Sequence, residues 1–261
     1  MQVPIVLYSY ELSPYAAKVR CFLGRKDLDY TTHYVDPLHA TAELPVGHQV
    51  PVLAIGDEAR NDSTPIGMWL DERFPDKPRL LPDASAERER VLALDEWVTR
   101  RLIPLTFRLM LGEGESLATR WRNRRRGART LHKTVPNGYR FPWRALHPLM
   151  VTRAGFIRRV IAETDPRKSN ASLLTEVLDQ LSETLGPNPF LGGQNAPTLA
   201  DLSAFAQLAF PYLAGYDGIE RIERNPRILA WLERVRSHLP PEAPLREDLW
   251  ERRWAEDVAT G

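Results

Sequence analysis

Cysteine is nearly missing from this chain of 261 residues, because Cys21 is the only one. A single thiol excludes an internal disulfide framework and is typical of proteins from a reducing compartment, so we expect a cytoplasmic protein. Cys21 falls well inside a predicted helix, which favours a small packed residue over a nucleophile.

A strong excess of one charge is also missing. The chain has 35 lysines and arginines against 34 aspartates and glutamates, a formal net charge of +1. No global field therefore attracts nucleic acid or an anionic membrane. There is no apolar run of membrane-spanning length and no signal-peptide pattern at the N-terminus. The six histidines are dispersed, so we predict no metal site, and we expect neither nucleic acid nor a membrane as partner.

Residues 1–82 have the pattern of a compact βαβ unit with further elements. Ser13 and Pro14 supply an N-cap and a first-turn proline for a helix, and Asp62 and Ser63 open another. The predicted strands lie at 5–8, 30–35 and 52–55. Prolines at 75, 78 and 82 then mark a linker, so we place a domain boundary near residue 82.

Residues 83–261 have the apolar spacing of an all-helical domain. The predicted helices lie at 86–111, 146–164, 170–185, 199–214 and 226–238. Within the last part, Thr198 and Asp201 have the spacing of a capping box, which we interpret as structural. The stretch at about 113–145 is basic and weakly periodic. We interpret it as an insertion or an extended helix end rather than as core.

Ser13 is the first candidate for chemistry. The start of a helix presents free N–H groups and a positive dipole end, which favour an anion such as a thiolate. The Ser13 hydroxyl could donate to that sulfur, and thereby lower a thiol pKa that is ordinarily about 8.5. The alternative is that Ser13 only caps its helix.

Two further motifs have similar double interpretations. Val50-Pro51 precedes a strand, and a cis bond there would turn the main chain of Val50 outward to pair with a peptide ligand. The alternative is an ordinary strand start. Asp62 and Ser63 could bind the α-ammonium and α-carboxylate of a ligand, or could only cap a helix.

The order of these motifs resembles the glutathione transferase family. Leu7 to Ser13, Lys18-Val19-Arg20 and Gln49-Val50-Pro51 are similar to the zeta class, and Asp62-Ser63 follows at the expected distance. Phe190 to Gly193, with the segment Pro197 to Asp201, resembles the helix-start signature of the same family. Asn61-Asp62-Ser63-Thr64 also resembles the membrane-associated prostaglandin E synthase with a glutaredoxin-like domain. That family has a Cys-x-x-Cys motif where this chain has Ser13 and Ala16, which argues against dithiol redox chemistry.

The resemblance implies a thioredoxin-like α/β N-terminal domain, an all-α C-terminal domain and a homodimer. It implies that Gln49, Val50, Pro51, Asp62 and Ser63 bind glutathione as co-substrate without a metal. It also implies that Ser13 activates the glutathione thiol, as the catalytic residue, for attack on a small hydrophobic electrophile. Conjugation, ether cleavage and isomerisation share this activated thiolate, so the sequence does not choose between them.

Several alternatives stay open. The chain could be a non-catalytic binding or scaffold protein that uses the arginines between Arg120 and Arg129, or a glutathione-binding protein whose insertion blocks the second pocket. Those arginines could equally form a solvated face. Tyr139, Phe141 and Trp143 could line the electrophile pocket or pack within the insertion. The side chains of His48, Lys18 and Arg20 could reach the glycine carboxylate of glutathione or stay solvated.

Overall fold

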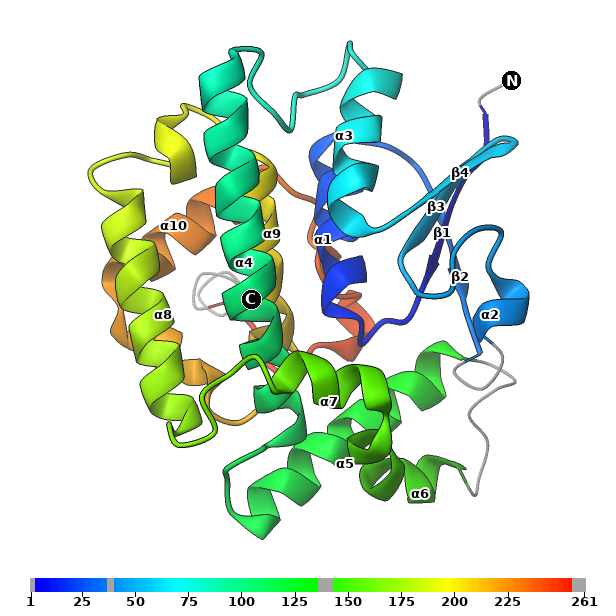
Figure 1. The fold of residues 1–261 in the computed structure, drawn as a ribbon, viewed down its shortest axis with the longest axis vertical. Helices are drawn as coiled ribbons and strands as arrows, with labels where there is room; N and C mark the ends of the chain where they lie inside the picture. Colours follow the sequence, from blue (N-terminus) through cyan, green and yellow to red (C-terminus); the bar gives the residue numbers. More distant parts are fainter. Residues whose placement is uncertain (1–2, 37–39, 136–142, 255–261) are drawn as a thin grey trace.

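A computed structural model describes residues 3–36, 40–135 and 143–254, and Figure 1 shows two parts, an α/β part and a helical part. The α/β part contains β1 (Ile5–Ser9), α1 (Pro14–Arg25), β2 (Thr31–Tyr34), α2 (Ala40–Glu43), β3 (Val52–Ile55), β4 (Glu58–Asn61) and α3 (Ser63–Arg73). The strand order is β2-β1-β3-β4. β1 is parallel to β2 and antiparallel to β3, and β4 is antiparallel to β3. The three predicted strands and both predicted helices are confirmed.

β4 was not predicted from the sequence, because it has few β-branched or aromatic residues. Its pairing comes from the tight turn at Gly56 and Asp57, where Gly56 has a φ of 60°. Ile55 then pairs with Glu58, and the register continues to Val52 opposite Asn61. A left-handed turn position favours glycine because a Cβ atom is strained there. The turn therefore specifies this strand more than the strand's own side chains do.

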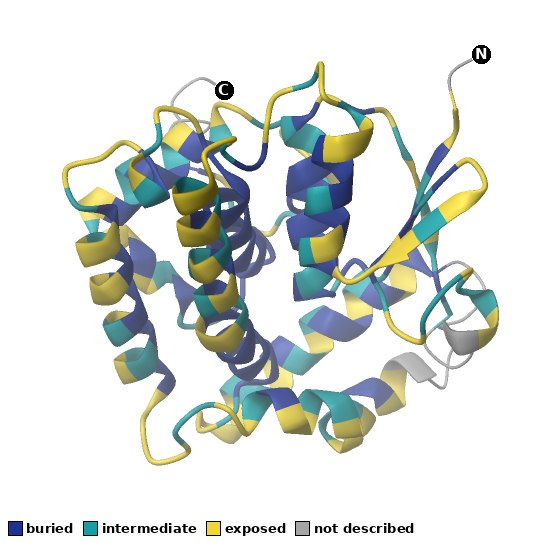
Figure 2. Ribbon diagram, turned by 45° about the horizontal axis from the view of Figure 1, so that its top comes forward, coloured by how far each residue is buried: buried dark blue, intermediate teal, exposed yellow. Residues whose placement is uncertain are grey.

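The helical part is arranged around one fully buried helix. All residues of α9 are buried, whereas α8 and α4 each expose an outer face to solvent (Figure 2). The elements are α4 (Ser85–Leu111), α5 (Leu117–Thr134), α6 (Trp143–Met150), η1 (Val151–Arg153), α7 (Gly155–Ile161), α8 (Asn170–Leu185), η2 (Leu191–Gly193), α9 (Leu199–Leu213), η3 (Ile219–Arg224), α10 (Pro226–Arg236) and η4 (Glu247–Leu249).

Two helical predictions need correction. The basic stretch after residue 113 contains the regular helix α5, which packs against α4 and α6 and buries Asn123, Gly127 and Leu131. Its buried face consists mostly of small and polar residues, with one leucine, so hydrophobic periodicity did not reveal the helix. The single helix predicted at 146–164 is broken, because Ala154 adopts an extended conformation between η1 and α7.

The expected capping box at the start of α9 is present. The Asp201 carboxylate accepts hydrogen bonds from the main-chain N–H and the hydroxyl of Thr198, each at 2.9 Å. It also accepts from the Leu191 N–H and the Trp231 ring N–H. Asp201 thus joins three segments of the helical part, in agreement with a structural role. Cys21 is fully buried, and burial raises the pKa of its thiol, as a packed residue requires.

A buried ion pair joins the two parts. The Lys18 ammonium on α1 lies 2.8 Å from the Asp95 carboxylate on α4, and both side chains are almost inaccessible to solvent. Asp95 also accepts hydrogen bonds from the hydroxyls of Thr64 on α3 and Ser203 on α9. Four helices therefore meet at one carboxylate.

Removal of this carboxylate should destabilise the whole chain. In Asp95→Ala the Lys18 ammonium stays buried without its partner, so we expect the free energy of unfolding to fall by about 3–5 kcal/mol, measured by urea denaturation. The matched control is Glu96→Ala on the same helix. Glu96 pairs with Arg100 at the surface, and its loss should cost less than about 1 kcal/mol. Equal losses in the two variants would contradict the prediction.

Candidate active site

Three of the predicted site segments meet at one edge of the sheet. β1 ends at Ser9, β3 begins at Val52 and β4 ends at Asn61, and the pairing of Tyr8 with Val52 and of Val52 with Asn61 brings these ends together. The loops that leave this edge carry Ser13, Gln49-Val50-Pro51 and Asp62-Ser63. Ser13 and Ser63, which are 50 positions apart in the chain, are therefore brought to the same end of the sheet.

Ser13 is the N-cap of α1. Its Oγ accepts a hydrogen bond from the Ala16 N–H at 3.2 Å, and the side chain is 9% exposed at the wall of a cavity. This bond occupies a lone pair on the oxygen and leaves the hydroxyl proton for another partner. Within the described residues, no hydrogen bond uses that proton.

The Val50–Pro51 peptide bond is cis, and Pro51 is buried directly before β3. Val50, Gln49 and the adjacent His48 line the same cavity as Ser13. Gln49 and His48 are exposed, so their side chains are accessible from solvent.

Asp62 precedes α3 in an unusual conformation, with φ of 69° and ψ of 134°, and its side chain makes no capping hydrogen bond. A residue other than glycine rarely adopts positive φ, and such outliers cluster at ligand sites. Asp62 is exposed, whereas Ser63 is 1% exposed. The plain capping interpretation of Asp62 is therefore wrong.

The cavity beside Ser13 has a volume of about 440 Å³. Most of its wall is apolar and comes from α4, α5, the end of α6, η1 and α7. The apolar side chains of this wall are Leu12, Phe107, Met110, Leu111, Leu131, Met150, Val151, Ala154, Phe156 and Ile157. No sequence signal pointed to these residues, because they come from distant elements. Tyr139, Phe141 and the side chain of Trp143, which were candidates for this wall, lie outside the described residues.

Three basic residues that were considered as ligands of a carboxylate have different positions. Lys18 is buried in the ion pair with Asp95. Arg20 is also buried, and it donates to the Pro244 and Glu11 carbonyl oxygens at 2.7 and 3.1 Å. Neither is solvated. Only His48 lies at the cavity.

The arginines of α5 mostly have partners within the chain. Arg122 and Arg126 form ion pairs with Asp217, at 2.6 and 2.8 Å, and Arg124 pairs with Glu113 at 2.9 Å. These pairs attach α5 to neighbouring segments. A phosphate site in this cluster would have to compete with carboxylates that already neutralise the charge.

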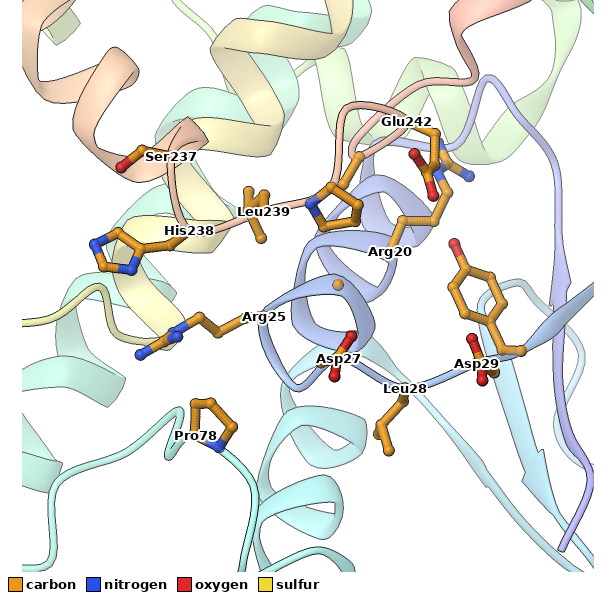
Figure 3. Close-up of a pocket in the computed structure, with 14 residues that line it drawn as sticks. Arg20, Arg25, Asp27, Leu28, Asp29, Pro78, Ser237, His238, Leu239 and Glu242 are labelled. Carbon is orange, nitrogen blue, oxygen red and sulfur yellow. The ribbon is translucent and has the colours of Figure 1, made fainter. Parts of the chain in front are cut away.

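A second cavity of about 500 Å³ lies at the opposite end of α1, next to Arg25 (Figure 3). Its wall combines Arg25 and His238 with the acidic residues Asp27, Asp29 and Glu242. None of the predicted glutathione ligands belongs to it. The cavity beside Ser13 is therefore the better candidate for the active site.

His147 adds a neutral imidazole to the wall of the active-site cavity. Burial lowers its pKa from 6.5 to about 4, and a hydrogen bond with the main chain of Arg124 offsets only part of this effect. The phenols of Tyr10 and Tyr15 also line the cavity, and burial raises the pKa of each to about 12. At neutral pH these three side chains carry no charge, which keeps the cavity suited to apolar molecules.

The depressed pKa of His147 predicts an acid-sensitive fold. In the unfolded chain this histidine takes up a proton near pH 6.5, whereas in the folded chain it is protonated only near pH 4. Its contribution to stability is present above pH 6.5 and is lost as the pH falls to 4, by about 3 kcal/mol in total. As the pH falls from 7 to 4, the unfolding free energy of the wild type should decrease relative to that of His147→Gln. A constant difference would contradict this.

Two family models match the chain. The model of the glutathione S-transferase N-terminal domain matches residues 7–78, and the model of the glutathione S-transferase C-terminal domain matches residues 165–234. The first match contains Ser13, Gln49-Val50-Pro51 and Asp62-Ser63. The second contains the capping box at Thr198 and Asp201.

Curated relatives are similar in sequence to this chain over part of their length. A glutathione S-transferase 1 from Dianthus caryophyllus is 40% identical over 106 residues, which are 38% of this chain and 47% of the relative. A probable maleylacetoacetate isomerase from Vibrio cholerae is 37% identical over 98 residues, 34% of this chain and 45% of the relative. The chain thus spans less than half the length of these two relatives.

Solved structures match over nearly the whole chain. A maleylacetoacetate isomerase from Anaeromyxobacter dehalogenans is 26% identical with a TM-score of 0.55, and the match covers 98% of this chain and 97% of the other. A rice glutathione S-transferase solved with glutathione is 21% identical with a TM-score of 0.59, over 94% and 92% of the two chains. These likenesses confirm the thioredoxin-like part and the all-α part.

Proposed function

Because this chain belongs to the glutathione S-transferase family, we propose that it is a glutathione-dependent enzyme that activates the glutathione thiol beside Ser13. The thiolate then attacks a hydrophobic electrophile in the adjacent cavity. The observation that carries this proposal is the position of Ser13, whose oxygen caps α1 while its hydroxyl proton is unused at the cavity wall.

The start of α1 suits a sulfur anion. Its first N–H groups and the positive end of the helix dipole lie beside the Ser13 hydroxyl, and all of these favour the thiolate over the thiol. The nearby aromatic hydroxyls stay protonated at neutral pH, so no anion among them repels the sulfur.

Glutathione would extend along the edge of the sheet. The main chain of Val50 would pair with its cysteinyl residue as an added strand does, with Gln49 and Pro51 shaping the same loop. Asp62 would accept the α-ammonium of the γ-glutamyl group, while Ser63 and the first N–H groups of α3 would bind its α-carboxylate. The strained conformation of Asp62 supports this role, because no capping bond explains it.

The second substrate would be a small apolar electrophile, since apolar side chains form most of the cavity wall. Conjugation, ether cleavage and isomerisation all fit an activated thiolate. Ether cleavage and isomerisation are the first reactions to assay. The relatives and similar structures include two maleylacetoacetate isomerases and a beta-etherase from Sphingobium.

The rival proposal is a non-catalytic protein that keeps this fold. The ion pairs of Arg122, Arg124 and Arg126 weigh against an anion-binding scaffold surface on α5. Calorimetry with millimolar glutathione separates the two proposals, because a ligand of the folded state also raises the melting temperature. Absence of both heat and stabilisation would favour the scaffold.

The domain boundary near residue 82, the homodimer, the cytoplasmic location and the lack of a metal stay predictions, and sedimentation tests the dimer.

Loss of the Ser13 hydroxyl should reduce turnover more than glutathione affinity. In Ser13→Ala the bound thiol loses its hydrogen-bond donor, so its pKa should rise, with kcat falling about tenfold or more and Kd for glutathione changing little. The measurements are steady-state kinetics and the ultraviolet absorbance of the bound thiolate against pH.

Ser169→Ala is the matched control for this variant. Ser169 caps α8 with a bond of 3.1 Å from the Ser172 N–H, and it lies outside the cavity. Both variants should lose about 1 kcal/mol of stability through the lost cap. If Ser169→Ala slowed turnover as much as Ser13→Ala, or if Ser13→Ala left the pH profile unchanged, the assignment of Ser13 would be wrong.

The charge of Asp62 should matter for the γ-glutamyl end of glutathione. Asparagine tolerates positive φ, so Asp62→Asn keeps the loop and removes only the charge. We expect Kd for glutathione to rise about tenfold or more, measured by calorimetry. An analogue without the α-amino group should bind the wild type and the variant equally. Equal loss for both ligands would instead indicate a distorted loop.

A further inference from the structure

A tyrosine at the inner wall of the active-site cavity has a hydroxyl group without a partner. Tyr216 is 1% exposed and lines the cavity together with Ser13. Its ring lies beside Phe210, and its main-chain N–H donates to the Pro211 carbonyl oxygen, so the side chain is held in place. No described residue forms a hydrogen bond with the Tyr216 hydroxyl. Its oxygen is not among the described side-chain atoms that are fully buried without a partner, so the hydroxyl faces the cavity.

Other polar groups on this wall are already engaged. The Asn123 amide donates to the Leu109 carbonyl oxygen at 2.8 Å and accepts from the Asp217 N–H. The Arg124 guanidinium donates to the Leu111 carbonyl oxygen at 3.0 Å and to Glu113. Neither is available to a ligand without loss of a bond that holds α5.

The remaining hydroxyls differ from Tyr216 in exposure. Tyr10 and Tyr15 are half-buried, whereas Tyr216 is 1% exposed. Burial raises the pKa of the Tyr216 phenol, so its hydroxyl is a hydrogen-bond donor at any physiological pH. Tyr216 is therefore the deep donor of the cavity.

A glycine on α5 leaves room in front of this donor. A Cβ atom added to Gly127 would lie 3.5 Å from the Tyr216 hydroxyl, 3.5 Å from Leu12 and 3.4 Å from His147. The space at Gly127 is thus bounded by the residue that precedes Ser13 and by Tyr216. An atom of a substrate that occupies this space has apolar contacts on one side and the phenol on the other.

We propose that the Tyr216 hydroxyl donates a hydrogen bond to an oxygen atom of the second substrate, and that the cavity therefore selects electrophiles whose oxygen gains negative charge during thiolate attack. This inference rests on the proposed function and adds the substrate class. Unsaturated ketones are the simplest members of that class.

The reaction of such a ketone balances without a further reagent. The glutathione sulfur, whose proton has gone to solvent, forms a bond to the β-carbon, and the π electron pair moves toward the carbonyl oxygen. Tyr216 stabilises the resulting enolate oxygen by its hydrogen bond and keeps its own proton. Water then supplies a proton to the α-carbon. Donors directed at developing charge stabilise the transition state more than the ground state.

The test compares two electrophiles of similar size, benzylideneacetone, which carries the oxygen, and benzyl chloride, which does not. With benzyl chloride the sulfur displaces chloride and no oxygen gains charge. Tyr216→Phe should lower the ratio of kcat/KM for the ketone over that for the chloride about tenfold or more. An unchanged ratio would overturn the proposal.

A binding experiment decides the same question without turnover. Saturated benzylacetone is inert toward thiols, and butylbenzene is its hydrocarbon counterpart. Calorimetry should show that the wild type prefers the ketone and that Tyr216→Phe loses most of this preference. Equal preferences in both proteins would overturn the proposal. Failure of the proposed function is separate, because it would appear as the absence of glutathione binding and of glutathione turnover.

Tyr212→Phe is the matched control on α9. The Tyr212 hydroxyl donates to Glu223 at 2.8 Å and lies outside the cavity. Loss of this hydrogen bond should lower the stability of the protein and leave its preference for the ketone intact. Tyr216→Phe should be about as stable as the wild type, because no described residue forms a hydrogen bond with the hydroxyl that is removed. A clear loss of stability in Tyr216→Phe would show that the hydroxyl already has a partner, which would also overturn the proposal.

Discussion

The ion pair between Lys18 and Asp95 is the constraint on which the geometry of the site depends. It fixes α1 against α4 at a point where the hydroxyls of Thr64 and Ser203 also converge. Ser13 begins the same helix, fewer than two turns before Lys18. Because the helix is rigid over that length, the position of Ser13 relative to the cavity wall on α4 follows from the buried pair. The two parts of the chain therefore form the candidate active site together rather than as separate modules.

Local chemistry explains what the sequence could predict. Ser13-Pro14 and Thr198 with Asp201 specify helix starts through bonds between residues a few positions apart, and those bonds are present in the structure. The cis bond at Val50–Pro51 was one of two alternatives that the sequence left open, and the structure has the cis form. Such features need no knowledge of the rest of the fold. The order of these motifs along the chain was enough to indicate the family.

Features that depend on distant partners were not predictable. β4 follows β3 after a two-residue turn, but its own side chains carry no strand pattern. α5 packs against α4 and α6, and Arg122, Arg124 and Arg126 pair with carboxylates elsewhere in the chain. A lone sequence shows these arginines as a run of like charge, which indicates a solvated or anion-binding face. The cavity wall was not predictable because its residues are distant in the sequence. Tyr216 and Gly127 are 89 positions apart and have no shared motif.

The structural and the chemical interpretation of Ser13 are not true alternatives. A hydroxyl oxygen accepts through its lone pairs and donates through its proton, so capping of α1 by Ala16 N–H uses one function and leaves the other. The capping bond also restricts rotation of the Ser13 side chain about its Cα–Cβ bond. A residue that only activated a thiol would have to lose that rotational freedom when the ligand binds. Here the capping bond already restricts the side chain, so the N-cap would lower the entropy cost of the proposed hydrogen bond to sulfur.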